Sequence, residues 1–184
     1  KEKKYPELIN PMFNLLENNI ALAGRRFAEN ENTLVISALD QAANTISGGA
    51  ALTIANITRA IQYLHDPGNK EATDFVIGFE VLNDLQNIDT FVEFQKVGNT
   101  EMLQRGFLGT IYGMNVIKVS SQAGMTATSS YVLDRQWAYV IVEKRPITVE
   151  NYDIPSHDLS ASSITNSLTV GSLRTSAIAR ITTT

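Results

Sequence analysis

The sequence predicts an α+β fold in which a long helix comes first, a mixed middle follows and long strands close the chain. Three observations lead to this prediction. Apolar residues recur every three or four positions near the start, and short apolar runs alternate with turn signals in the middle. β-branched and aromatic residues then dominate the last third. The chain has no internal repeat, and its element order is not a regular βαβ series.

The first predicted element is a long helix over residues 11–31. Asn10 and Pro11 are favourable residues at a helix start. One apolar stripe runs along the helix and consists of Phe13, Leu16, Ile20, Ala23 and Phe27. A single stripe indicates a helix that lies along one neighbouring surface. Gly24 in this helix costs about 1 kcal/mol relative to Ala unless a neighbour packs closely there.

The sequence in the middle of the chain predicts short helices and strands. Residues 34–39 are a short apolar run, and residues 40–50 are small and give no regular pattern. Thr53 is expected to cap a second helix, which ends at the Pro and Gly of residues 65–69. Its apolar residues have helical spacing at Ile54, Ile57, Ile61 and Leu64. A brief buried strand over 75–77 and a short helix over 79–85 follow.

The last third of the sequence predicts strands. Residues 106–119 contain glycines that indicate a turn, followed by a strand that begins at Met114. Further strands are expected at 131–133 and 137–142, with an extended segment at 145–149 and a strand-forming tail over 168–184. Polar loops over 120–130 and around Pro155 separate these segments.

The composition excludes several classes of protein. The 184 residues include 15 Lys and Arg against 19 Asp and Glu, a net charge of −4, which excludes a bulk positive field for nucleic acid. The chain has no cysteine, which excludes a thiolate nucleophile, a Cys-based zinc site and a disulfide framework. No run of about 20 apolar residues occurs, so no membrane-spanning helix is expected. Only 18% of residues are charged, which favours a surface that contacts a partner.

No set of residues predicts catalysis. His65 and His157 are the two histidines, and neither has a second ligand at metal-binding spacing, so we interpret both as solvent-facing loop residues. There is no Gly-x-Ser-x-Gly motif. Gly106, Gly109 and Gly113 match neither a phosphate loop nor a dinucleotide-binding fingerprint. We therefore expect no enzyme activity, no catalytic residues, no cofactor and no metal site.

Three weaker patterns also receive structural interpretations. The acidic residues Asp84, Asp89, Glu93 and Glu101 are interpreted as a solvated rim, with an acidic contact surface as the alternative. The sequon at Asn56–Thr58 lies within a predicted helix and is interpreted as a chance match. The lysines of residues 1–4 form too short a cluster for a nucleic-acid-binding arm.

The order of these features resembles the major capsid proteins of tailed bacteriophages and archaeal viruses, the Hong Kong 97-type shell fold. The helix that ends in residues 24–31 (GRRFAENE) resembles the family's spine helix. Residues 53–64 and 74–85 resemble the helix, strand and short helix of its axial domain. The pattern Gly106-x-x-Gly109-x-x-x-Gly113-x-x-Val116 is similar to a turn of the family that leads into a strand. Residues 138–150 resemble its peripheral-domain strand, and residues 174–181 its final strand.

The resemblance implies two domains. Residues 1–34 and 141–171 would form the peripheral domain, and residues 35–140 and 172–184 the axial domain. Copies of the protein would assemble in the host cytoplasm, through pentamers and hexamers, into an icosahedral virion shell. The shell would enclose double-stranded DNA without sequence-specific contact and without a membrane. Residues near Gly48–Leu52 and the loop Ser120–Ser130 would lie at lateral contacts between copies.

The chain departs from the family pattern at its start. In the family an N-terminal arm and an extended loop precede the spine helix, so we interpret this chain as a core fragment that is monomeric or weakly associated. Some members cross-link a Lys on that loop to an Asn in the peripheral loop. Asn166 lies in about the right region, but the Lys region is missing, so we do not infer the cross-link.

The sequence leaves three alternatives to a viral capsid. The same fold builds encapsulin nanocompartments, which is the first alternative to a viral capsid. A secreted or surface binding module with an α+β fold is an alternative from a different class. An enzyme is the third alternative. It would need a pocket with convergent polar groups, which the sequence does not predict.

Overall fold

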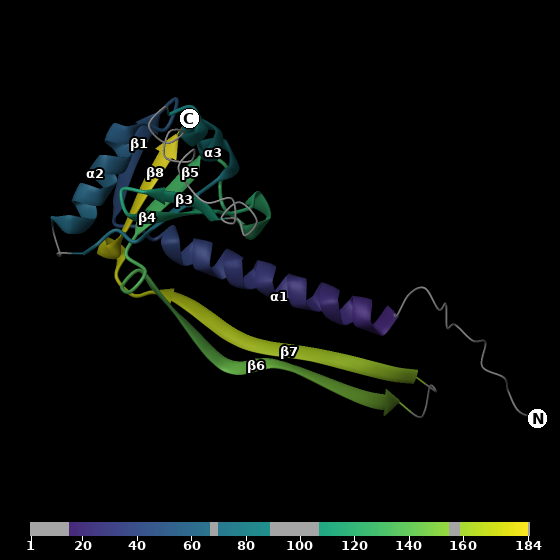
Figure 1. Cartoon of the computed structure of the whole chain (residues 1–184). Helices are drawn as coiled ribbons and strands as arrows, with labels where there is room; N and C mark the ends of the chain where they lie inside the picture. The colour runs from purple at the N-terminus through teal and green to yellow at the C-terminus, as the bar shows by residue number, and fades with distance from the viewer. Residues whose placement is uncertain (1–14, 67–69, 89–106, 155–158, 184) are drawn as a thin grey trace, which may run out of the picture.

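The computed structural model describes residues 15–66, 70–88, 107–154 and 159–183, and it contains one six-stranded sheet and one two-stranded ribbon (Figure 1). The helices are α1 (Leu15–Leu39), α2 (Ile54–His65) and α3 (Phe79–Gln86). The strands are β1 (Asn44–Gly49), β2 (Asp74–Ile77), β3 (Phe107–Ile111), β4 (Met114–Lys118), β5 (Ser129–Leu133), β6 (Tyr139–Ile154), β7 (Leu159–Ser172) and β8 (Ile178–Thr183). Short 3-10 turns lie at Ser121–Ala123 and Thr175–Ala177. The α+β class predicted from the sequence is confirmed.

The six-stranded sheet has the order β1-β8-β5-β2-β4-β3. β1 pairs with β8 and β2 with β4 in parallel, whereas the other three pairings are antiparallel. Side chains alternate between the two faces of a strand, so Phe75 and Ile77 of β2 pack among α2 and α3, while Val76 packs toward the end of α1. Helices therefore cover both faces of this sheet. We call the sheet together with α2 and α3 the body.

The ribbon consists of β6 and β7, which pair antiparallel over 16 and 14 residues. It extends from the body beside α1, a helix of 25 residues and about 37 Å (Figure 1). α1 lies along β7 and touches β6 only slightly. A two-stranded sheet is marginally stable by itself in water, so the ribbon depends on what packs against it.

α2 and α3 follow their sequence predictions closely. Thr53 is the N-cap of α2, and its side chain accepts a hydrogen bond from the Asn56 N–H at 3.4 Å. Ile57, Ala60 and Leu64 are buried on one face of α2. The predicted buried strand and short helix are confirmed as β2 and α3.

The glycine-punctuated turn is the tip of a hairpin formed by β3 and β4. Tyr112 and Gly113 both have positive φ values, 49° and 81°, as a type I′ turn requires. β4 confirms the strand predicted to start at Met114, but β3 was not predicted.

Several other sequence predictions of secondary structure are wrong. The first helix does not end at residue 31 but continues to Leu39, because Ile36 and Leu39 keep helical spacing and are buried against the sheet. It therefore crosses the predicted boundary between residues 34 and 35. The tail over 168–184 is not one strand: it contains the end of β7, a 3-10 turn at Thr175–Ala177 and β8. Finally, residues 44–49 form β1 in a stretch where no element was predicted.

The formation of β1 has a tertiary cause. Its sequence, NTISGG, has low strand propensity, but Ile46 is buried in the core and the strand pairs with β8. At Gly48 an added Cβ would lie 3.0 Å from Thr183 Cγ2, so the close approach of β8 favours glycine there. Within the part of the chain that the structure describes, no helix is long and apolar enough to cross a membrane.

Candidate interaction surfaces

The residues considered as catalytic or metal-binding candidates do not come together within the part of the chain that the structure describes. His65 is exposed in the last turn of α2, whereas His157, Gly106 and the lysines of residues 1–4 lie outside the described residues. Across residues 15–66, 70–88, 107–154 and 159–183, no three His, Asp or Glu side chains gather closely enough to hold a metal ion.

Asp84 has a structural contact rather than a place on a solvated rim. Its half-buried carboxylate accepts a hydrogen bond from the Leu52 N–H at 2.9 Å, which ties α3 to the segment before α2. Asp89, Glu93 and Glu101 lie outside the described residues. The sequon residue Asn56 is also engaged, because its Nδ2 donates to the Gly48 carbonyl at 3.1 Å.

The two predicted lateral contact segments contain both core and surface residues. Leu52 is buried, so it belongs to the core, while residues 49–51 are exposed beside it. In the 120–130 segment, Ala123 and Met125 are buried, and Gly124 lies close to Thr33 of α1. That loop therefore holds α1 in place. A contact with another copy through its exposed residues stays a prediction.

A polar cluster fixes the end of α1 to the sheet. The Tyr131 hydroxyl donates to Asp40 Oδ1 at 2.5 Å, and Arg180 Nη1 lies 3.2 Å from the same oxygen. Arg180 Nη2 also donates to Ser129 Oγ at 3.2 Å. Burial, and after it the hydrogen bond to Asp40, raises the pKa of Tyr131 above its ordinary value. This cluster links α1, β5 and β8, and no sequence motif predicted it.

Lys70 is a second polar residue that the sequence did not single out. It is only 7% exposed, and its Nζ donates to Ser176 Oγ at 2.5 Å. The contact joins the segment after α2 to the 3-10 turn that leads from the ribbon into β8. Nothing in the local sequence distinguishes Lys70 from a surface lysine, because its burial depends on residues about a hundred positions away.

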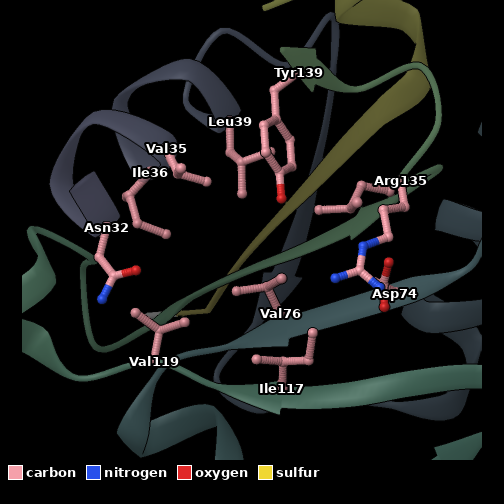
Figure 2. Close-up of a pocket in the computed structure, with 11 residues that line it drawn as sticks. Asn32, Val35, Ile36, Leu39, Asp74, Val76, Ile117, Val119, Arg135 and Tyr139 are labelled. Carbon is pink, nitrogen blue, oxygen red and sulfur yellow. The ribbon is translucent and has the colours of Figure 1, made fainter. Parts of the chain in front are cut away.

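A pocket of about 150 Å³ lies between the C-terminal half of α1 and the sheet (Figure 2). Its walls are mostly apolar and include Ile36, Leu39 and Val76. Figure 2 shows the Tyr139 hydroxyl directed into the pocket and the Arg135 side chain beside Asp74. The lining contains no His, Ser, Cys or Lys, so it offers no nucleophile with an adjacent base.

The face of the ribbon toward α1 is only partly covered. In β7, alternate residues (Asn166, Leu168, Val170 and Ser172) are half-buried, whereas Ser167, Thr169 and Gly171 are exposed. The register places Ile141 beside Val170 and Val149 beside Ile164 on this covered face. Because α1 follows β7, the apolar side chains of β6 stay exposed, and Ile147 is 53% accessible.

The opposite face of the ribbon also exposes apolar side chains. Val140 pairs with Gly171 and Val142 with Thr169, and both valines are exposed. At the base of the ribbon, Arg174 stacks over the Trp137 ring at 4.7 Å. A sheet with exposed apolar groups on both faces is typical of a surface that contacts a partner.

Asn166 lies in β7, half-buried beside α1. Its Oδ1 atom is buried and has no hydrogen-bond partner within the described residues. The side chain therefore lies on the covered face of β7, beside α1, and not in an open loop.

No family model and no curated protein matches the chain. Solved structures do match. A chain from Mycobacterium phage Che8 has a TM-score of 0.71 at 12% identity, over 90% of this chain and 62% of that one. The SrpI encapsulin of Synechococcus elongatus PCC 7942 has a TM-score of 0.61 at 12% identity, over 95% and 68%. The capsid of cyanophage P-SCSP1u has a TM-score of 0.60 at 14% identity, over 94% and 67%.

These similarities establish the fold. The chain has the Hong Kong 97-type shell fold that the sequence predicted, shared with phage capsids and encapsulins. It spans 62% of the length of the phage Che8 chain that it matches.

Proposed function

We propose that the chain is a shell-forming structural protein, and that its copies tile a closed icosahedral particle. The observation that carries the proposal is the ribbon, which exposes apolar side chains on both faces within a fold shared with a phage capsid and an encapsulin. A surface of this kind is unfavourable in water and becomes favourable when neighbouring copies cover it.

The two parts of the chain would have different roles in the shell. α1 and the ribbon would form the flat peripheral domain, and the body the wedge-shaped axial domain, whose tips gather into pentamers and hexamers. The exposed residues of 49–51 and of the 120–130 loop would face neighbouring subunits. The low overall charge supports this proposal, because charged residues are depleted at the centre of protein interfaces.

We further propose that the shell is a virion that encloses double-stranded DNA and assembles in the host cytoplasm. Two observations support it: the similarity to the phage Che8 chain and a net charge of −4, which lets a wall surround DNA without binding it strongly. The encapsulin alternative is favoured by the similarity to SrpI, which covers 95% of this chain. No enzyme activity is expected under either alternative.

Sedimentation velocity tests the proposal. The 184-residue chain alone should sediment as a monomer or a small oligomer, while the complete gene product should sediment as shells. Nuclease treatment of the shells then separates the two kinds of cargo: a virion retains protected double-stranded DNA, and a nanocompartment retains protein. A complete gene product that stays monomeric at all concentrations would refute shell formation.

A further inference from the structure

Sheet edges are the places where a folded protein can pair with another strand. An edge strand presents unpaired N–H and C=O groups, and proteins protect such edges with short strands, bulges, proline, charged side chains or a covering element. The described part of this chain has four edges, on β1 and β3 of the body and on β6 and β7 of the ribbon. Comparison of the four shows which one is open.

Both edges of the body are protected. β1 has six residues, its register shifts between Ser47 and Gly49, and its Gly48 carbonyl already accepts the Asn56 side chain. β3 has five residues, and its register shifts between Phe107 and Thr110, around Gly109 with a φ of 111°. Neither edge offers a long regular row of backbone groups.

The edge of β6 is long but carries several protective features. Pro146 lies in its middle and lacks an N–H group, and the register shifts twice, between Glu143 and Arg145 and between Arg145 and Thr148. Glu143, Lys144 and Arg145 are all exposed there. A strand added to this edge would lose hydrogen bonds and meet charged side chains.

The edge of β7 has none of these features. Its 14 residues, LSASSITNSLTVGS, contain no Asp, Glu, Lys, Arg or Pro. Among the residues that the structure describes, no strand pairs with its outer edge. α1 covers one face of β7, which leaves the in-plane direction of the outer backbone groups available. β7 is thus a long, uncharged edge next to one that is well protected.

We propose that β7 pairs through this edge with β7 of a second copy, antiparallel about a twofold axis. The two ribbons would then form one four-stranded sheet in the order β6-β7-β7-β6. A second copy fits because a twofold contact must be self-complementary, and an uncharged strand meets no like charge opposite itself in any register. This inference rests on the proposed function, since it names one contact through which copies of the chain associate.

The absence of cysteine in the chain allows a direct test by spin labelling. Four single variants, Ser163→Cys, Thr165→Cys, Ser167→Cys and Thr169→Cys, place labels at alternate positions of β7 on the face away from α1. In an antiparallel pair, moving the label one residue from the axis separates the two labels by roughly 6.8 Å, twice the 3.4 Å rise of a strand. Pulsed electron paramagnetic resonance on the chain at about 1 mM should therefore give distances that change by roughly 14 Å per step.

Two double variants that introduce lysines test the same edge by measuring the affinity of self-association. Ser167→Lys/Thr169→Lys places two lysines on exposed positions of β7, which is how natural edge strands are protected. Ala55→Lys/Gln62→Lys is the control, because it places two lysines on exposed positions of α2, in the body and away from the ribbon. The β7 pair should weaken association at least tenfold, and the α2 pair should change it less than twofold. Unfolding midpoints of the variants verify that each is folded, and the label distances stand independently of them.

The outcomes separate the edge contact from shell formation. If labels in β7 show distances that do not vary with position, or if the α2 pair weakens association as much as the β7 pair, copies meet through another surface and the edge inference is wrong. A chain that stays monomeric at 1 mM also contradicts it. In each of these cases shells of the complete gene product would leave the proposed function intact.

Discussion

Replacing Tyr131 by Phe tests whether the polar cluster at the end of α1 holds the helix on the sheet. The change removes one hydroxyl and keeps the ring, which is 1% exposed and lies under Arg180 at 5.9 Å. The lost bond to Asp40 is charge-assisted, and such bonds contribute about 1.5–3 kcal/mol. Asp40 keeps Arg180 as a partner and its side chain is 43% exposed, so the carboxylate is not left unsolvated.

We therefore expect the free energy of unfolding to fall by about 1.5 kcal/mol, at the lower end of that range. Urea titration followed by circular dichroism measures the change at neutral pH. Tyr112→Phe is the control, because that side chain is exposed in the hairpin turn and its substitution should have almost no effect. An equal midpoint for wild type and Tyr131→Phe would show that the cluster does not stabilise the fold.

The pH dependence gives the same cluster a second signature. Since burial and Asp40 raise the pKa of Tyr131 above its ordinary value of 10.0, the unfolded chain releases this proton first as pH rises. The wild type therefore loses stability above pH 10, where the unfolded state binds fewer protons. Its advantage over Tyr131→Phe should therefore shrink as the pH rises from 9 to 11. An advantage that stays constant over this interval would contradict the raised pKa.

Three further substitutions test local features of the fold by the same urea titration. Gly24→Ala should stabilise the protein by about 1 kcal/mol, because no atom lies within 4 Å of the added Cβ in α1; a loss of stability would show that α1 is packed there. Gly78→Ala should destabilise it by more than 2 kcal/mol, since its Cβ would lie 2.4 Å from the Ala127 carbonyl oxygen; tolerance of Ala would mean that this loop moves freely. Thr53→Ala should cost about 0.5–1 kcal/mol through the loss of the α2 cap to the Asn56 N–H, whose 3.4 Å length places it at the weak end of such caps; no change would show that the cap does not contribute.

The elements that the sequence predicted well are those whose signals are local. Thr53 and the apolar spacing from Ile54 to Leu64 define α2, and Tyr112–Gly113 define the hairpin turn, since each depends on a few neighbouring residues. The end of α1 was missed because the polar residues around Thr33 interrupt the apolar stripe before Ile36 and Leu39 resume it at the sheet.

The candidate interaction surfaces could not be predicted from local sequence patterns, because they form between segments that are distant in the sequence. β1 forms from residues of low strand propensity because β8, more than a hundred positions later, pairs with it. The burial of Lys70 and the bond between Tyr131 and Asp40 likewise join distant segments. The apolar residues of β6 were visible in the sequence, but their exposure follows from the position of α1 along β7. Low charge indicated a contact surface without saying where it lies.

Electron cryo-microscopy of the complete gene product tests the central claim, that this fold forms a shell, most directly. The account predicts closed icosahedral particles in which the body of each subunit gathers around the fivefold and sixfold positions and α1 with its ribbon lies flat in the wall between them. Particles would contradict the account if α1 and the ribbon projected from the wall without touching a neighbour. A preparation that contains only monomers and small oligomers, with the protein folded, would contradict it outright.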